Sequence, residues 1–182
     1  MTRGRLSFGV LGNPAPQGSH TAKPIYAGGQ FTGRVAVHES SASVKPWRDS
    51  VQWAAVDAMH KAKLSGPLTG PVMVNVTFRL RRPLSDFSTG RTTTHLVRPS
   101  APTFPIKRPD IDKLVRSTFD ALTLARVWVD DSQVASLKAT KVYAGRAEKP
   151  GASITISSIP QVLARSADRY DIETVSVDPE SL

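Results

Sequence analysis

The chain contains no cysteine. This absence excludes disulfides, zinc–thiolate sites and thiol nucleophiles, and it leaves oxygen and imidazole groups as the side chains that could hold a metal. Runs of about 18 apolar residues are also absent, so the sequence predicts no membrane-spanning segment. The N-terminal stretch MTRGRLSFGV lacks the long apolar core of a signal peptide. We therefore expect a cytoplasmic protein.

Acidic residues are scarce relative to basic ones. The 182 residues include 24 lysines and arginines but 15 aspartates and glutamates, which gives a net charge of +9. The end of the chain reverses this balance, because residues 159–182 hold two bases and five acids and so leave +12 on residues 1–158. A body this basic favours a polyanionic partner such as nucleic acid.

Length and periodicity predict one α+β domain. Alternating apolar residues predict a strand over 71–80, and apolar residues at helical spacing predict one helix that begins near Pro46 and another over 110–122. Further strands are predicted over 5–11, 127–129, 133–143 and 152–157, and the Gly- and Pro-rich residues 12–43 predict a loop or hairpin. We expect a mixed β-sheet packed against two main helices in residues 1–158, followed by an acidic tail at 159–182.

Aspartates are concentrated in one segment. Five of the ten acids of the body lie between residues 110 and 131, namely Asp110, Asp112, Asp120, Asp130 and Asp131. The four histidines are scattered instead (His20, His38, His60 and His95). Mg²⁺ takes oxygen ligands, usually one or two carboxylates with waters and phosphates. An aspartate cluster on a basic body therefore predicts metal-assisted phosphodiester cleavage, with Arg116 or Lys138 as a cation that stabilises charge on the attacked phosphate.

The start of the second helix is expected to bring the first two aspartates together. Residues two apart on a helix point about 200° away from each other, so Asp110 and Asp112 converge only if Asp110 lies at the helix start. Pro109 favours a boundary there, because the residue before a proline is pushed out of helical conformation. The turn WVDDSQV follows a predicted strand, and we expect it to hold Asp130 and Asp131 against the start of this helix.

Structural roles account for the same residues. Asp110 is a natural N-cap, and Asp112 suits the first turn of a helix. The Asp–Asp–Ser of residues 130–132 is also typical of a hairpin turn. Asp120 is expected to pair with Arg116 one turn earlier rather than to bind metal. Spacing alone leaves both interpretations open.

Several strings of the sequence resemble one family, the RusA-type Holliday-junction resolvases. RPDIDKLVRSTFDAL and VWVDDSQVASLKATK resemble its D-x-D-N-L-x-K helix, which is followed by D-A-L and by a W-x-D-D-x-Q strand ending in lysine. NPAPQGSHTAK is similar to that family's Pro/Gly-rich basic loop, and VKPWRDSVQWAA is similar to its first helix. The resemblance covers residues 6–157, and its specific part is the combination of D-x-D with D-D.

The resemblance implies a RusA-like fold and a homodimer that binds four-way and other branched DNA and nicks two opposing strands symmetrically. It implies Mg²⁺ or Mn²⁺ as cofactor and a role in DNA recombination and repair, in a bacterial cell or a phage-infected host. By position, Asp110, Asp112 and Asp131 are the implied catalytic carboxylates, with Asp130 as a fourth metal ligand.

Two positions depart from the family pattern. The family lysine falls on Arg116, which keeps the charge and a role as phosphate stabiliser but cannot act as a general base. The family asparagine falls on Lys113. The basic residues expected to contact DNA are Lys23, Arg34, Arg81, Arg82, Lys107, Arg108, Lys113 and Lys138.

Two other functions stay open. A non-catalytic protein that binds branched DNA is consistent with the departures at Arg116 and Lys113. A metal-dependent transferase could use D-x-D for a nucleotide-sugar diphosphate, although the chain is short for such an enzyme and its basic body favours a longer polyanion. A haloacid-type phosphatase is disfavoured, because its motif needs Thr or Val where Leu114 stands.

Overall fold

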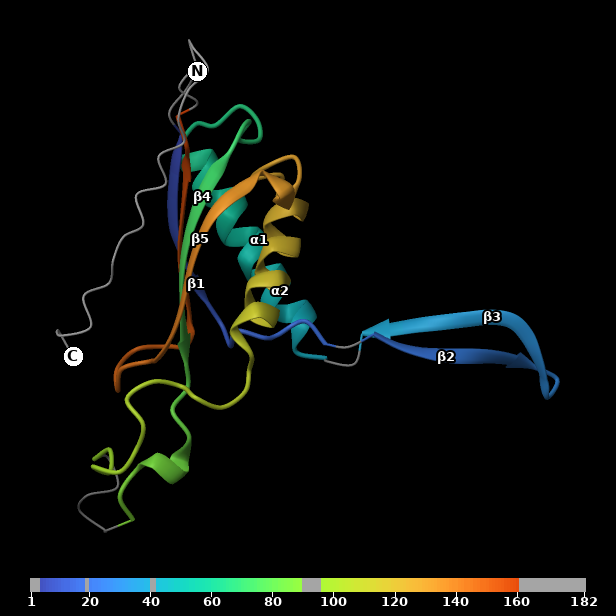
Figure 1. Cartoon of the computed structure of the whole chain (residues 1–182), viewed down its shortest axis with the longest axis horizontal. Helices are drawn as coiled ribbons and strands as arrows, with labels where there is room; N and C mark the ends of the chain where they lie inside the picture. The colour runs from blue at the N-terminus through green and yellow to red at the C-terminus, as the bar shows by residue number, and fades with distance from the viewer. Residues whose placement is uncertain (1–3, 19, 40–41, 90–95, 161–182) are drawn as a thin grey trace, which may run out of the picture.

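The computed structural model describes residues 4–160 apart from 19, 40–41 and 90–95. Its centre is a four-stranded sheet in the order β1-β6-β4-β5, made of β1 (Arg5–Leu11), β6 (Gly151–Ser158), β4 (Val72–Leu80) and β5 (Val134–Tyr143). β5 is parallel to β4, and the other pairs are antiparallel. The helices α1 (Val44–Lys61) and α2 (Ile111–Leu124) cover one face of this sheet (Figure 1). The predicted α+β fold, a mixed sheet with two main helices in one domain, is confirmed.

The core lies between the sheet and the two helices. Every second residue of β4, from Val72 to Leu80, is buried, and the residues between them are half-buried or exposed. Ile154 and Ile156 of β6, Trp47 of α1 and Leu114 of α2 close the same core. Burying a large apolar side chain contributes about 1.5–3 kcal/mol. The period-2 pattern of β4 therefore fixes which face of the sheet the helices cover.

The two helices are joined by polar contacts as well as by packing. The Trp47 indole Nε1 donates a hydrogen bond to Thr118 Oγ1 over 3.2 Å, and the Thr118 hydroxyl donates to the carbonyl of Leu114 over 2.8 Å. At the rim of the same interface, an Arg48 Nη2 to Asp120 Oδ2 contact of 2.5 Å links α1 to α2. These pairings fix the rotation of α2 about its own axis.

A long crossover connects β4 to β5. Parallel strands cannot be joined by a tight turn, so the chain must return along the sheet before β5 begins. It leaves β4 through a loop that contains the short 3-10 helix η1 (Leu84–Asp86), returns as α2, and enters β5 through a second 3-10 helix, η2 (Asp131–Gln133). The start of α2 therefore lies near one end of the sheet, and η2 lies near the other (Figure 1).

A hairpin projects from the body. Strands β2 (His20–Ala27) and β3 (Gln30–Glu39) pair only with each other and stand away from the sheet (Figure 1). Their two-residue turn consists of Gly28 and Gly29, both with positive φ, as tight hairpin turns require. The hairpin falls within residues 12–43, where the sequence predicts a loop or hairpin.

Two expectations about the chain's course need comment. The predicted strand over 127–129 is wrong: of these three residues, Trp128 alone takes part in β pairing, through an isolated bridge to Leu68. Its apolar pattern has another cause, because Val127 and Trp128 are buried, with the Trp128 ring 5.3 Å from that of Phe119 in an edge-on contact. Most of the predicted tail, residues 161–182, lies outside the described residues. None of the described helices has the length and apolar character needed to cross a membrane.

The close approach of β1 and β6 yields a test of the fold. A Cβ on Gly151 would lie 2.0 Å from the carbonyl oxygen of Val10, whereas a Cβ on Gly9 would meet nothing within 4 Å. We expect Gly151→Ala to lower the free energy of unfolding by about 1–3 kcal/mol or more, and Gly9→Ala to change it by less than about 1 kcal/mol. Urea titrations of both variants measure this difference. Equal effects at the two positions would contradict the register.

Candidate active site

The start of α2 carries two carboxylates that the fold does not use. Asp110 occupies the N-cap position with extended backbone (φ −72°, ψ 139°), but its side chain makes no capping hydrogen bond. Asp112 follows in the first turn, and its carboxylate has no hydrogen bond or ion pair within the described part of the chain. Both side chains are exposed. The helix boundary is where Pro109 predicted it, and a capping role does not account for Asp110.

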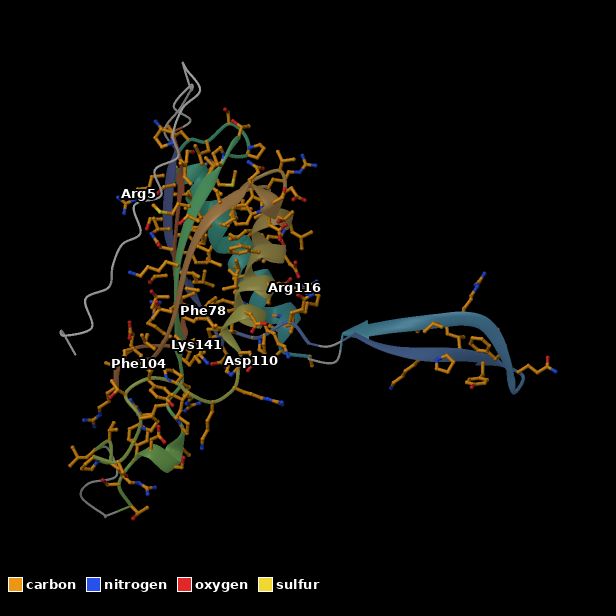
Figure 2. All side chains as sticks on the ribbon, in the orientation of Figure 1. Arg5, Phe78, Phe104, Asp110, Arg116 and Lys141 are labelled. Atoms are coloured by element: carbon orange, nitrogen blue, oxygen red, sulfur yellow. The ribbon has the colours of Figure 1, made fainter. Side chains whose placement is uncertain are left out.

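Cations surround these carboxylates. Lys113 Nζ lies 3.5 Å from Asp110 Oδ2, and both side chains are half exposed. Lys141, from the far end of β5, donates hydrogen bonds to the carbonyls of Lys107 (3.2 Å) and Pro109 (2.8 Å). Figure 2 shows Asp110 and Lys141 together at the lower end of α2. Lys141 therefore ties the segment that leads into Asp110 to the edge of the sheet.

The loop after β1 forms a second wall beside the helix start. The backbone N–H of Gln17 donates to the carbonyl of Lys113 over 3.0 Å. Asn13 and Pro14 line a cavity of about 190 Å³ together with Arg108 and Pro109. The N-terminal Pro/Gly-rich segment therefore helps to position the residues on either side of Asp110.

Asp130 and Asp131 have different environments. Asp130 caps η2: its carboxylate accepts the backbone N–H of Ser132 over 2.9 Å, and the Gln133 side chain accepts the N–H of Asp130 in return. Hydrogen bonds from the Ser132 side chain and backbone lower the pKa of Asp130 below its ordinary value of 3.8. The Asp131 carboxylate is exposed and has no partner within the residues described. Asp130 thus has a structural role that Asp131 lacks.

The expected meeting of the two aspartate pairs within one chain is wrong. Among the described residues, no three histidine or acidic side chains lie close enough together to hold a metal ion. The cause is the length of α2: Asp110 precedes its first residue, and Asp131 comes after its last one. Fourteen helical residues span about 21 Å at 1.5 Å per residue. One chain therefore carries two separate groups of carboxylates, Asp110 with Asp112, and Asp131.

The basic residue near Asp112 is Arg116, one helical turn further along. The predicted pairing of Asp120 with Arg116 is wrong, because Asp120 binds Arg48 of α1 instead. The partner lies 72 positions away in sequence, so local spacing could not reveal it. Arg116 is left exposed and without an ion pair among the described residues. Its guanidinium is available to an anion that approaches the start of α2 (Figure 2).

The residues predicted to contact DNA differ in position and in exposure. Lys23 and Arg34 lie on the projecting hairpin, and both are exposed. Four exposed residues lie around the start of α2 or in the loop before it: Arg81, Lys107, Arg108 and Lys113. Arg82 is instead held by Asp86 at 3.2 Å and by the carbonyl of Pro102, so it is largely buried and is not free for DNA.

Lys138 lies on the wrong face of the sheet for its predicted role. Its register partner is Asn75, next to Thr155 and Ser7 on the sheet face away from the helices. Lys138 therefore cannot stabilise charge at Asp112 in the same chain. The lysine that reaches the helix start is Lys141. It lies two residues after Ala139, which packs against the core, so both side chains are on the sheet face that the helices cover. Strand alternation could have identified Lys141 from the sequence.

The comparison with protein families identifies one family. The profile of the family described as endodeoxyribonuclease RusA matches residues 16–157. The matched segment runs from the loop after β1 almost to the end of β6, and it includes Asp110, Asp112 and Asp131. A search of curated proteins finds no match for the chain.

The contrast between Asp130 and Asp131 can be tested by stability. We expect Asp130→Ala to lower the midpoint of thermal unfolding near pH 7, because it removes the cap of η2, and Asp131→Ala to leave the midpoint unchanged. The pKa of Asp130 is lowered in the folded state, so its stabilising effect is complete above pH 3.8 and is lost as the pH falls through the lowered value. The gap between wild type and Asp130→Ala should therefore close in acid. A larger effect at Asp131 would contradict the assignment.

Proposed function

Since the chain belongs to the RusA endodeoxyribonuclease family, we propose that it resolves four-way DNA junctions by metal-dependent nicking of two opposing strands. The observation that supports this most directly is the pair Asp110 and Asp112. Their carboxylates are exposed and uncapped at a helix start, on a surface that is otherwise basic. Such a pair on a protein body of +12 is costly near DNA phosphates unless a cation neutralises it.

The residues at the helix start suit a divalent cation. Mg²⁺ is usually held by one or two carboxylates, with waters and substrate phosphates as further ligands. Asp110 and Asp112 supply two such carboxylates, neither of them engaged by the fold except through the 3.5 Å contact of Asp110 with Lys113. When bound, the ion would activate a water and neutralise charge on the attacked phosphate. Asp110 and Asp112 would hold the ion, and the Lys113 ammonium, 3.5 Å from Asp110, would then have to leave that carboxylate.

The cations around this pair have separate tasks. The Arg116 guanidinium donates to the phosphate oxygens and stabilises the charge that develops there. Lys107 and Arg108, directly before Pro109, bind the DNA backbone on the other side of Asp110. Lys141 does not bind DNA in this scheme. It holds the carbonyls of Lys107 and Pro109 and so positions the carboxylates.

Assembly as a homodimer would complete the metal site. Asp131 lies at the other end of α2 from Asp110, so a two-fold axis that crosses α2 and β5 near their middle brings the partner's Asp131 toward Asp110 and Asp112. β5 is an edge strand of the sheet, which leaves its outer backbone groups open for pairing. Exposed apolar side chains occur at the end of α2, just before η2 and on β5, namely Leu124 (64% exposed), Val129 (69%) and Leu137 (46%). A second copy would cover them and would give two identical sites for paired nicks.

The function can be tested with a labelled four-way junction. We expect nicks at two symmetric positions with Mg²⁺, and a loss on the order of 10²–10³-fold for Asp112→Asn, with junction binding kept or tightened because a charge that repels phosphate is removed. Asp49→Asn, whose charge is paired with Lys45 on the exposed side of α1, is the control and should cleave normally. Tight binding without nicks by the wild type, under conditions where another resolvase is active, would instead support a non-catalytic junction-binding protein.

Mixed dimers test whether the site is shared between copies. We expect Asp112→Asn and Asp131→Asn each to be inactive alone. If each site takes Asp112 from one copy and Asp131 from the other, a mixed dimer contains one intact site, so an equal mixture recovers roughly a quarter of the wild-type sites. Refolding the two variants together and assaying the junction measures this recovery. No recovery, from a mixture shown to contain mixed dimers, would mean that each site is built within one chain.

A further inference from the structure

A basic cleft lies at the same end of the sheet as the start of α2. It is a cavity of about 570 Å³ between the loop that follows β4 and the turn that joins β5 to β6. Its walls carry Arg81 from the loop and Arg146 and Lys149 from the turn, and Phe87 and Tyr143 supply aromatic surface. Figure 1 shows this turn beside the loop that leads into α2.

The acidic groups near this cleft are already neutralised. Glu148 lies in its wall, but one carboxylate oxygen is 3.3 Å from Arg79 Nε and the other accepts the backbone N–H of Gly145 over 3.1 Å. Asp86 is paired with Arg82 at 3.2 Å, and both side chains are about 85% buried. The Arg82 guanidinium also stacks on Tyr143, 4.0 Å from the ring centre. Arg82 therefore forms the floor of the cleft rather than a binding group.

Three cations remain without a partner. Arg81, Arg146 and Lys149 are exposed, and none of them has an ion pair or a side-chain hydrogen bond within the described residues. They come from two segments that are far apart in sequence and meet only in the fold. With Glu148 and Asp86 engaged elsewhere, the cleft presents three positive charges to solvent. An anionic ligand would neutralise these three charges.

The cleft continues toward Asp110. The cavity of about 190 Å³ beside the helix start shares Arg81 and Tyr143 with it, and its other walls include Lys107, Arg108 and Pro109. Asp110 follows Pro109 directly. Two neighbouring cavities with free cations in their walls therefore lie between the β5–β6 turn and Pro109, which directly precedes the carboxylate pair. A single small anion would need donors that converge on one point, whereas these charges are distributed along a path, as a chain of phosphates requires.

We propose that the two joined cavities form a channel that binds the phosphates of one DNA strand as it runs to or from Asp110 and Asp112. Arg81 lies where the cavities join, and Arg146 and Lys149 hold the strand at the outer end. The channel rests on the proposed function, because it directs a strand of the substrate to the proposed cleavage site. It adds a binding role for the β5–β6 turn, which the D-x-D and D-D motifs do not include.

The salt dependence of binding tests the channel. Each phosphate contact contributes about 0.9 to the slope of log affinity against log salt. The double variant Arg146→Ala/Lys149→Ala should therefore lose about 1.8 from this slope for a four-way junction, measured without divalent metal so that no strand is cut. Between about 50 and 200 mM salt, wild-type affinity should then fall about twelvefold more than that of the variant. Arg81→Ala alone should lose about half as much slope.

A matched control removes the same charge elsewhere. Arg5, on the far edge of the sheet (Figure 2), and Lys63, just after α1, are exposed and have no ion pair within the described residues, so Arg5→Ala/Lys63→Ala should leave the slope unchanged. An unchanged slope in the channel variant, or an equal loss in both double variants, would overturn the channel. If the wild-type protein nicks junctions but Arg146→Ala/Lys149→Ala keeps the wild-type slope, the channel is overturned and the proposed function is not. A wild type that binds no branched DNA would overturn the proposed function with it.

Discussion

The parallel pairing of β4 with β5 is the constraint on which the arrangement of the site depends. Because a tight turn cannot join parallel strands, the chain must return along the sheet between them, and α2 forms this return. Asp110 and Asp112 lie where the helix begins, and Asp131 lies after it has ended. No side-chain rotation spans a distance of about 21 Å. The separation of the carboxylates follows from the topology rather than from any detail of the loops.

This separation has a consequence for how the proposed nuclease is controlled. A single copy offers a cation only Asp110 and Asp112, which Lys113 partly neutralises. If the third carboxylate comes from the partner, full metal binding requires assembly, and a monomer bound to DNA cannot cut it. The same two-fold axis that completes one site completes the other. Paired incision and dependence on dimerisation would then share one structural origin.

The sequence predicts the elements better than the contacts between them. The periodicities of β4 and α2 reflect burial on one face, so both elements are found almost at their true bounds. Local sequence patterns do not reveal the direction of the crossover. The sequence therefore predicts the turn at Asp130 beside the start of the helix, whereas it lies beyond the helix end. Arg48 and Asp120 meet across 72 positions, which spacing cannot reveal. Lys141 is different, because the alternation of side chains along β5 places it on the face that the helices cover.

The distribution of charge separates structural acids from the candidates for function. Five of the ten carboxylates of the body have a cationic partner, in the pairs Asp49–Lys45, Asp57–Lys61, Asp86–Arg82, Asp120–Arg48 and Glu148–Arg79. Asp130 is occupied as a cap. Asp112 and Asp131 have neither kind of partner among the described residues, and Asp110 has only the 3.5 Å contact with Lys113. Among the acids whose side chains the structure describes, the fold neutralises the others and leaves these exposed, which concentrates negative charge at two points, as expected if a cation is to bind there together with DNA phosphates.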